Sequence, residues 1–214
     1  MTNLFNSILV FALMLNLFAL GTSRIVVIIR IVAAQGALVA LLPLLSHGNP
    51  LSPLILIPVL LAVALKGVVI PGMMARALVT TKIKREVEPL IGLQASVILG
   101  ACGTVVALLF DDKLPLTPAH TGLLIVPAAF ATMFTGFLLL ITRYKALTQV
   151  MGYLVLENGI FTFGLLLVEA MPLVVEMGVL LDMFVGIFVI CIIVNHINQA
   201  FASTDTRLLV SLKE

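Results

Sequence analysis

Charged residues are scarce in this chain. Asp, Glu, Lys and Arg make up 10% of the 214 residues, and hydrophobic residues make up 62%. A typical soluble domain contains about 25% charged residues. This deficit excludes an ordinary soluble domain and predicts an all-α, polytopic integral membrane protein. The net charge of +2 says little, because the placement of positive charges is what matters in a membrane protein.

The residue patterns of metal, redox and hydrolytic chemistry are also missing. Cys102 and Cys191 form no CxxC pair, which argues against iron–sulfur or zinc ligation. His47 and His120 are expected at the outer face and His196 near the cytoplasmic face, so they cannot face each other as haem ligands. There is no Walker A loop, no dinucleotide fingerprint and no usable nucleophile–base pair. We expect no cofactor, no metal and no catalytic residue on this chain.

Seven apolar segments reach the roughly 17–25 residues that a helix needs to cross a bilayer. They cover 4–22, 25–46, 53–76, 89–110, 119–142, 148–168 and 173–196. The start MTNLFNS has no basic residue and no A-x-A-like site follows it, so we expect a retained first span rather than a signal peptide. We predict one membrane domain, with a four-helix part over 1–118, a three-helix part over 119–198 and a cytoplasmic tail over 199–214.

The basic residues predict the orientation of these spans. With seven spans, only Lys113 falls on one side of the membrane. The other side receives Arg24, Arg76, Lys82, Lys84, Arg85, Arg143, Lys145, Arg207 and Lys213. Because positive residues accumulate in cytoplasmic loops, this distribution places the N-terminus outside and the C-terminus in the cytoplasm.

Two basic residues lie within spans. Arg30 lies near the cytoplasmic end of its helix, where a long side chain can reach the headgroups. Lys66 lies near the middle of the third span, too deep for that. Pro71 follows and leaves the Gly67 carbonyl without its usual helical donor. Such a break is tolerated where protein or water covers it, so we expect a polar pocket at Lys66. Lys66 is either functional or a structural counter-ion.

Three carboxylates interrupt the last two apolar segments, in QVMGYLVLENGIFTFGLLLVEAMPLVVEMGVLLD. They are Glu157, Glu176 and Asp182. With spans alternating in direction, Glu157 and Asp182 lie at the depth of Lys66, and Glu176 lies about 9 Å nearer the outer face. A carboxylate in lipid costs at least a few kcal/mol. The carboxylates therefore either fix helix packing through buried polar contacts or form a path for protons or cations.

Weaker polar candidates surround this group. Tyr153 lies on the helical face of Glu157, and Asn158 adds an amide beside it. Gln35 and Gln94 are single amides in apolar helices, and we interpret them as partners in hydrogen bonds between helices. We include Tyr153, Asn158 and Gln94 as supporting polar residues of the site.

Several stretches of the chain carry a family resemblance. They are GYLVLENGIF, PLVVEMGVLLDMFVGIFV, RYKALTQV, ALKGVVIPGMMARAL and the tail TDTRLLVSLKE. Together they resemble the membrane component E of hydrogenase-4. The resemblance covers nearly the whole chain, although the first 24 residues contribute only hydrophobicity. Its most specific part is Glu157-Asn158-Gly159 combined with Glu176 and Asp182.

The resemblance implies a place in the membrane arm of a group 4 nickel–iron hydrogenase, such as a formate hydrogenlyase, in the cytoplasmic membrane of a prokaryote. Residues 121–198 resemble the small K-type subunit of respiratory complex I. In this chain Glu157 stands five residues after Gly152, about one helical turn later than the K-type pattern places its first glutamate. The implied partners are antiporter-like subunits and the hydrogenase-proximal membrane subunit, besides the lipid bilayer, and no nucleic acid.

We therefore expect a non-catalytic subunit in which Lys66, Glu157, Glu176 and Asp182 contribute to a proton or sodium path. Glu157 and Asp182 would hold protons, and Lys66 would influence their protonation. One alternative is a purely architectural subunit. Another is a free-standing ion transporter or channel, which the lack of carboxylates in the N-terminal helices disfavours, because no second half mirrors the C-terminal part.

Overall fold

The structure, a computed structural model, describes residues 2–46, 53–80, 89–111 and 123–167. All regular elements in these ranges are helices, which agrees with the predicted fold class. They are α1 (Thr2–Gly21), α2 (Ile25–Ala40), α3 (Leu42–Ser46), α4 (Pro53–Ala64), the π-helix η1 (Leu65–Val69), α5 (Ile70–Thr80), α6 (Leu93–Asp111), α7 (Ile125–Thr142), α8 (Ala146–Gly164) and the short 3-10 helix η2 (Leu165–Leu167).

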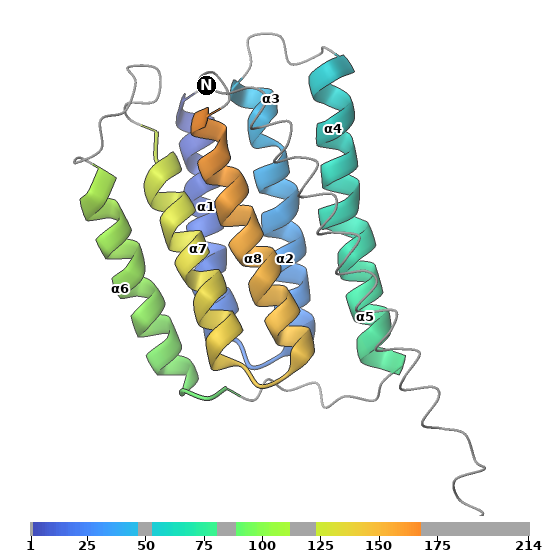
Figure 1. Cartoon of the computed structure of the whole chain (residues 1–214), viewed down its shortest axis with the longest axis vertical. Helices are drawn as coiled ribbons and strands as arrows, with labels where there is room; N and C mark the ends of the chain where they lie inside the picture. Colours follow the sequence, from blue (N-terminus) through green and yellow to red (C-terminus); the bar gives the residue numbers. More distant parts are fainter. Residues whose placement is uncertain (1, 47–52, 81–88, 112–122, 168–214) are drawn as a thin grey trace, which may run out of the picture.

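Five of these helical segments are long and apolar enough to cross a membrane. They are Asn3–Gly21, Ile25–Leu45, Leu56–Val79, Leu93–Phe110 and Ile125–Thr142. Helix α8 has a similar length and lies among them (Figure 1). The helices support the prediction of a membrane-embedded protein. The last predicted span, 173–196, lies outside the described residues.

Helix ends differ from the predicted spans where proline or glycine intervenes. The second span is divided at Leu41, two residues before Pro43, into α2 and α3. The fourth span was predicted from residue 89, but its helix begins at Leu93, after Pro89 and Gly92. Apolar composition continues through these positions, whereas proline lacks the N–H that a helix interior needs.

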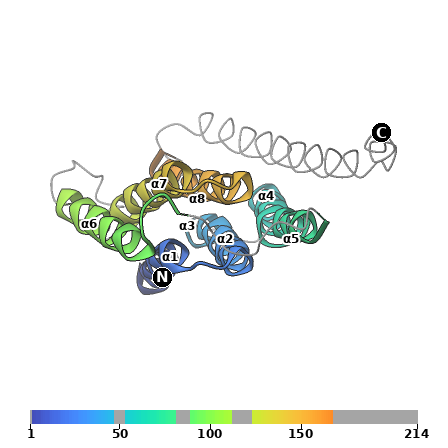
Figure 2. The same cartoon turned by 90° about the horizontal axis from the view of Figure 1, so that it is seen from below.

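The long helices run up and down, and their ends meet at two common levels (Figure 1). The lower end in that view holds the end of α1, the start of α2, the end of α5 and the turn between α7 and α8. Figure 2 shows α1 and α2 beside α7 and α8, with α6 on one flank and α4–α5 on the other. Since α1 packs against α7 and α2 against α8, the parts predicted over 1–118 and 119–198 form one bundle in the described residues.

Two apolar clusters fill the bundle. The lower cluster includes Ile25, Ile28, Met74, Leu139 and Met151 and lies toward the lower end. The upper cluster consists of Phe5, Leu9, Val39, Leu42, Ile125, Ala128 and Leu165. On the outside, large apolar side chains such as Val68 and Ile98 are exposed. An apolar exterior around a packed interior is what a bundle surrounded by lipid or other membrane helices requires.

Glycines bring α7 and α8 into backbone contact. A Cβ on Gly159 would lie 2.6 Å from the backbone nitrogen of Met133, and a Cβ on Gly136 would meet the backbone of Leu156. Small residues allow such close approach between helices, which gains van der Waals contact where lipid supplies no hydrophobic driving force. This packing fixes the face that α8 presents to α2 and η1.

Candidate functional site

The helix that carries Lys66 changes its geometry at that residue. Positions Leu65–Val69 form a π-helix between α4 and α5, and the N–H of Ile70 donates to the carbonyl of Leu65 across five residues. Pro71 follows and has no N–H to donate. Single π-helical turns within α-helices are rare and frequently occur at functional sites. The predicted irregularity near Lys66 is therefore confirmed.

Lys66 and Glu157 form an ion pair inside the bundle. The Lys66 Nζ lies 3.3 Å from Glu157 Oε1 and donates to Asn158 Oδ1, also at 3.3 Å. The two charged side chains are only 10% and 12% exposed. The ring of Phe161 lies over the ammonium, with its centroid 5.1 Å from Nζ, a distance at which a cation is attracted to an aromatic face. The prediction that Lys66 and Glu157 share one depth is confirmed.

Glycines on two helices make room for the lysine. A Cβ on Gly36 of α2 would lie 3.0 Å from the Cβ of Lys66 and 3.6 Å from Asn158 Nδ2. A Cβ on Gly67 would lie 3.3 Å from that of Ala37. Helix α2 and η1 therefore approach closely, and the lysine side chain passes between α2 and α8.

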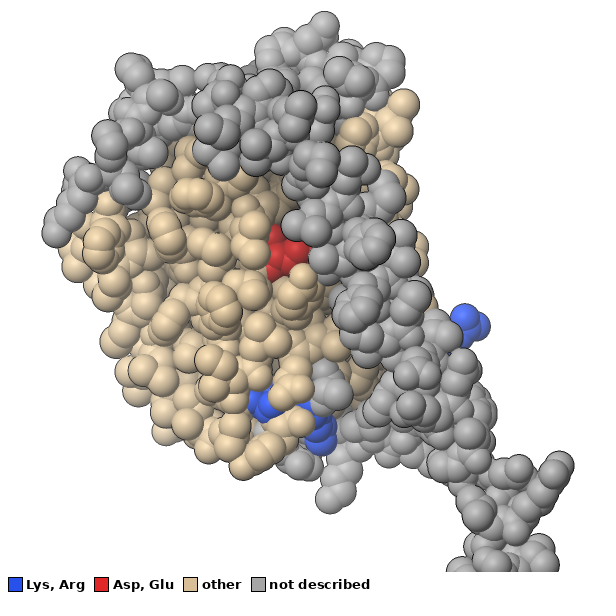
Figure 3. Space-filling model, viewed as in Figure 1, with Lys and Arg blue, Asp and Glu red and all other residues tan. Residues whose placement is uncertain are grey.

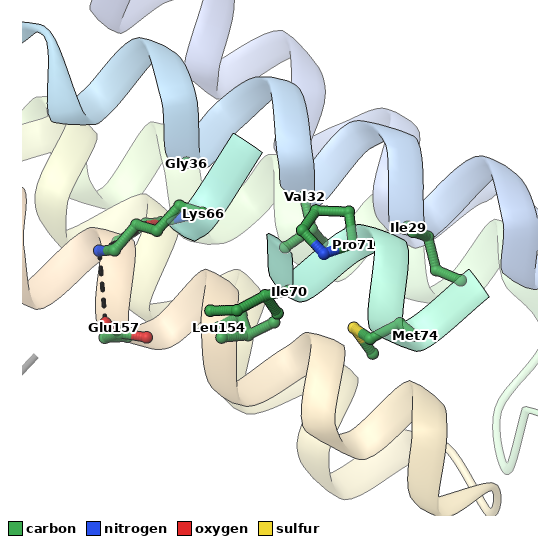
Figure 4. A pocket seen from close by; sticks show the side chains of 10 residues that line it. Ile29, Val32, Gly36, Lys66, Ile70, Pro71, Met74, Leu154 and Glu157 are labelled. Atoms are coloured by element: carbon green, nitrogen blue, oxygen red, sulfur yellow. Dashed lines mark hydrogen bonds and ion pairs between the residues drawn. The ribbon is translucent and has the colours of Figure 1, made fainter. Parts of the chain in front are cut away.

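A cavity of about 10 Å³ adjoins the ion pair. Lys66, Glu157 and Asn158 supply its polar lining, and apolar side chains of α2, α5 and α8 supply the rest (Figure 4). This volume is close to the minimum that holds one water molecule. Figure 3 shows acidic atoms at mid-height beside uncharged atoms, with the visible Lys and Arg atoms lower in the view.

The side chains of the ion pair can themselves bind and release a proton. Two buried opposite charges are tolerated because they neutralise each other and make further hydrogen bonds. A proton on the carboxylate would leave the ammonium without this counter-charge, and Asn158 and the ring of Phe161 would still contact it. The arrangement suits a site that stores or relays one proton.

The other predicted site residues are placed apart from this pair or outside the described residues. Tyr153 is partly buried against the lower cluster. Gln94 lies exposed in the first turn of α6, and α6 packs against α1 and α7. Glu176 and Asp182 lie outside the described residues.

A second buried polar cluster lies between α1, α2 and α7. The amide of Gln35 donates to Asn16 Oδ1 at 2.7 Å, and Asn16 Nδ2 donates to Thr132 Oγ1 at 2.8 Å. The interpretation of Gln35 as a partner in a hydrogen bond between helices is confirmed. In the described ranges, no group of three or more His, Cys, Asp or Glu residues could hold a metal ion.

Sequence reasoning missed three contributors to these clusters: Gly36, Phe161 and Asn16. Gly36 follows Gln35 directly, and a glycine beside an amide within an apolar helix signals close packing. Phe161 lies four residues after Glu157, on the same helical face. Asn16 is an amide with apolar residues on both sides in α1, a signal equal to that of Gln35.

The fold and the site define a membrane-embedded helical protein with an internal ion pair. A curated relative is the uncharacterized protein Rv0085 of Mycobacterium tuberculosis, which is 35% identical over 191 residues, covering 87% of this chain and 86% of the relative. The chain belongs to the same family as Rv0085. No family model and no solved structure matches the chain. The relative's name states no activity, so a function for this chain has to be inferred from the chemistry of the site.

Proposed function

We propose that this protein is a membrane subunit that relays ions, with Glu157 as a proton-holding carboxylate and Lys66 as its counter-charge. The observation that carries the proposal is the largely buried ion pair, 3.3 Å between Lys66 Nζ and Glu157 Oε1, in a bundle whose interior is mostly apolar. Ionisable residues at membrane depth are costly and mark ion paths or proton relays in many membrane proteins.

The resemblance to hydrogenase-4 component E supplies the proposed setting. The chain would lie in the membrane arm of a complex I-like nickel–iron hydrogenase, between antiporter-like subunits and the hydrogenase-proximal membrane subunit. Glu176 and Asp182 would continue the path, and the redox chemistry would take place in other subunits. The proposed topology has seven spans in the cytoplasmic membrane of a prokaryote.

In this function, the ion pair works as a two-state element. A proton that reaches Glu157 neutralises the carboxylate and weakens its attraction to Lys66, while Asn158 and Phe161 still hold the ammonium. Because opposite charges interact strongly in a medium of low dielectric, a charge that moves in a neighbouring subunit can shift the proton occupancy of Glu157. Sodium ions would compete with the ammonium for the same carboxylate.

Replacing Glu157 tests the proposal. Glu157→Gln keeps the size and hydrogen bonding of the side chain but removes the titratable group, whereas Glu157→Asp keeps a carboxylate. We expect assembly to survive in both variants, with ion transport lost in Glu157→Gln and partly kept in Glu157→Asp. Transport is measured as acidification of inverted vesicles during turnover, and assembly as the antiporter-like and hydrogenase subunits recovered with a tagged chain. A Glu157→Gln complex with wild-type assembly and transport would contradict the proposal.

An architectural function is the second candidate, because both charges of the pair come from this one chain. In that case Glu157→Gln should weaken assembly, since removing one partner of a buried pair costs about 3–5 kcal/mol. The double variant Lys66→Met/Glu157→Gln separates the two functions, because replacing a whole buried pair by uncharged residues is often neutral. An architectural pair predicts a working complex in the double variant, whereas an ion path predicts an assembled complex without transport.

A further inference from the structure

We propose that the buried cluster of Gln35, Asn16 and Thr132 positions the ion pair, because its hydrogen bonds set the rotation of α2 about its own axis. The inference rests on the proposed function and adds positioning residues that do not touch the pair. It is drawn from a series of contacts that runs around the bundle and closes on α2.

The first half of this series is a chain of hydrogen bonds through three helices. Gln35 of α2 donates to Asn16 of α1 at 2.7 Å, and Asn16 donates to Thr132 of α7 at 2.8 Å. All three residues are buried. Because a hydrogen bond has a preferred length and direction, the chain fixes how α2 is turned relative to α1 and α7.

The second half of the series continues from α7 through α8 to η1. Met133 follows Thr132 on α7, and a Cβ on Gly159 of α8 would lie 2.6 Å from the Met133 backbone nitrogen. Asn158 precedes Gly159 and accepts a hydrogen bond from Lys66 Nζ at 3.3 Å. The position of Lys66 is therefore tied to that of Thr132 through the contact between α7 and α8. Figure 2 shows α1, α2, α7 and α8 as neighbours, with α4–α5 beside α2 and α8.

The series closes on α2 at two adjacent residues. Gly36 follows Gln35, and adjacent residues of a helix point about 100° apart, so one faces α1 while the other faces η1. A Cβ on Gly36 would lie 3.0 Å from the Lys66 Cβ. Figure 4 shows Gly36 beside Lys66, whose side chain extends toward Glu157. A rotation of α2 that broke its bond to Asn16 would turn a larger residue toward Lys66 and displace the ion pair.

Apolar packing alone defines the rotation of α2 poorly. This helix carries apolar residues on its exposed side, such as Val27, and on its buried side, such as Ile28 and Val32. In lipid, no hydrophobic driving force distinguishes the two sides. A buried amide does, as a single buried asparagine fixes the register of a coiled coil. Gln35 Oε1 has no hydrogen-bond partner in the described part of the chain, a cost that an apolar residue would avoid, so the amide serves position rather than stability.

A disulfide between α2 and η1 reports the rotation of α2. A Cβ on Gly67 would lie 3.3 Å from the Cβ of Ala37, near the range of about 3.5–4.5 Å found in disulfides. Ala37→Cys/Gly67→Cys is made in the full chain with its own partners. Cys102 and Cys191 are replaced by serine, so that only the new pair can react. The rate of disulfide formation is measured in membranes, with copper phenanthroline as the oxidant.

Two isosteric variants interrupt the chain of hydrogen bonds, and a third is their control. Thr132→Val removes its last acceptor, and the triple variant Asn16→Leu/Gln35→Met/Thr132→Val replaces the whole chain by apolar side chains of similar shape. Thr135→Val is the matched control. Thr135 lies three residues further along α7 and is buried, but its hydroxyl has no hydrogen-bond partner in the residues that the structure describes.

We expect the triple variant to assemble, because replacing all partners of buried hydrogen bonds by apolar groups of the same shape is nearly neutral. Its disulfide should form at least about tenfold more slowly, since cysteines that are turned apart cannot be bridged without backbone movement. Without the new cysteines, the pH of half-maximal ion transport should move by about one unit or more, because a displaced Lys66 changes the charge beside Glu157. Thr132→Val should change both measurements less, and Thr135→Val neither.

Three outcomes would overturn the inference. They are wild-type disulfide formation in the triple variant, equal slowing in Thr135→Val, and an unchanged transport pH profile in a triple-variant complex whose transport depends on Glu157. If the triple variant does not assemble, Thr132→Val decides, and wild-type disulfide formation in that variant would overturn the inference.

The disulfide result and the transport result can fail separately, because disulfide formation needs no ion transport. If Glu157→Gln transports normally while the triple variant slows the disulfide, the ion-relay proposal fails and the chain still sets the rotation of α2. If Glu157→Gln abolishes transport but the triple variant leaves the disulfide unchanged, the positioning residues are wrong and the relay proposal stands.

Discussion

At the scale of single residues, the site depends on how many partners hold Lys66. A buried ion pair stabilises a fold only where further hydrogen bonds compensate the loss of hydration. Lys66 has a carboxylate, an amide oxygen and an aromatic face around its ammonium. It reaches all three because Gly36 presents no side chain to it. The absence of a side chain at Gly36 therefore contributes to the geometry of the pair.

The first prediction concerns Gly36→Ala. The added methyl group would lie 3.0 Å from the Lys66 Cβ, so η1 must shift and the ion pair is displaced. We expect a loss of about 1–3 kcal/mol, the usual cost of overpacking, together with reduced ion transport. Gly72→Ala is the control, because a Cβ there meets no atom within 4 Å and reports the helix-propensity gain alone. The readouts are the thermal midpoint of the purified complex and vesicle acidification; similar midpoints and transport for both variants would refute the prediction.

The charged members of the site could be predicted from the sequence, whereas the uncharged ones could not. Lys66 and Glu157 stand out because charge is rare in apolar spans, and alternating span directions place them at one depth. Gly36 and Phe161 are ordinary in an apolar helix. Their function follows only from which helices are neighbours, and apolar composition carries little information about neighbours.

At the scale of helices, the end of α1 depends on an arginine that directly follows α7. Arg143 is 1% exposed and donates from Nη2 to the carbonyl of Leu20 at 2.9 Å. Leu20 supplies one of the last carbonyls of α1, which have no donor within the helix. Burial lowers the pKa of the Arg143 guanidinium, although arginine remains charged at physiological pH. The sequence predicted Arg143 only as one of the positive charges on the cytoplasmic side. Its packing beneath α1 is seen in the structure alone.

The second prediction is that Arg143→Leu destabilises the bundle. The Leu20 carbonyl would remain buried without a donor, which costs about 1–3 kcal/mol. Tyr144→Leu is the neighbouring control, because Tyr144 is 65% exposed and substitutions at such surface positions usually change stability by less than about 0.5 kcal/mol. Thermal unfolding in detergent followed by circular dichroism measures both. Equal midpoints for the two variants would show that the Arg143–Leu20 contact contributes nothing.

At the scale of the whole molecule, the lengths of the apolar segments predicted where the helices lie. Proline and glycine near the segment ends moved the observed helix ends away from the predicted ones. Each predicted span that falls within the described residues contains a helix, because span length is a local property of the chain. Which helices pack against each other is not a local property of the chain. It depends on glycines such as Gly136 and Gly159, which bring two backbones together, and on polar contacts such as that of Asn16 with Thr132.

The last prediction is the orientation of the bundle. If the lower end faces the cytoplasm, the position of Lys84 is cytoplasmic and that of Lys113 is outside; both positions lie outside the described residues. A membrane-impermeant maleimide added to intact cells should therefore label Lys113→Cys and not Lys84→Cys, in a chain with Cys102 and Cys191 replaced by serine. Permeabilised cells, in which both variants should react, provide the control. The reverse pattern would invert the topology, whereas labelling of both in intact cells would contradict the predicted number of spans.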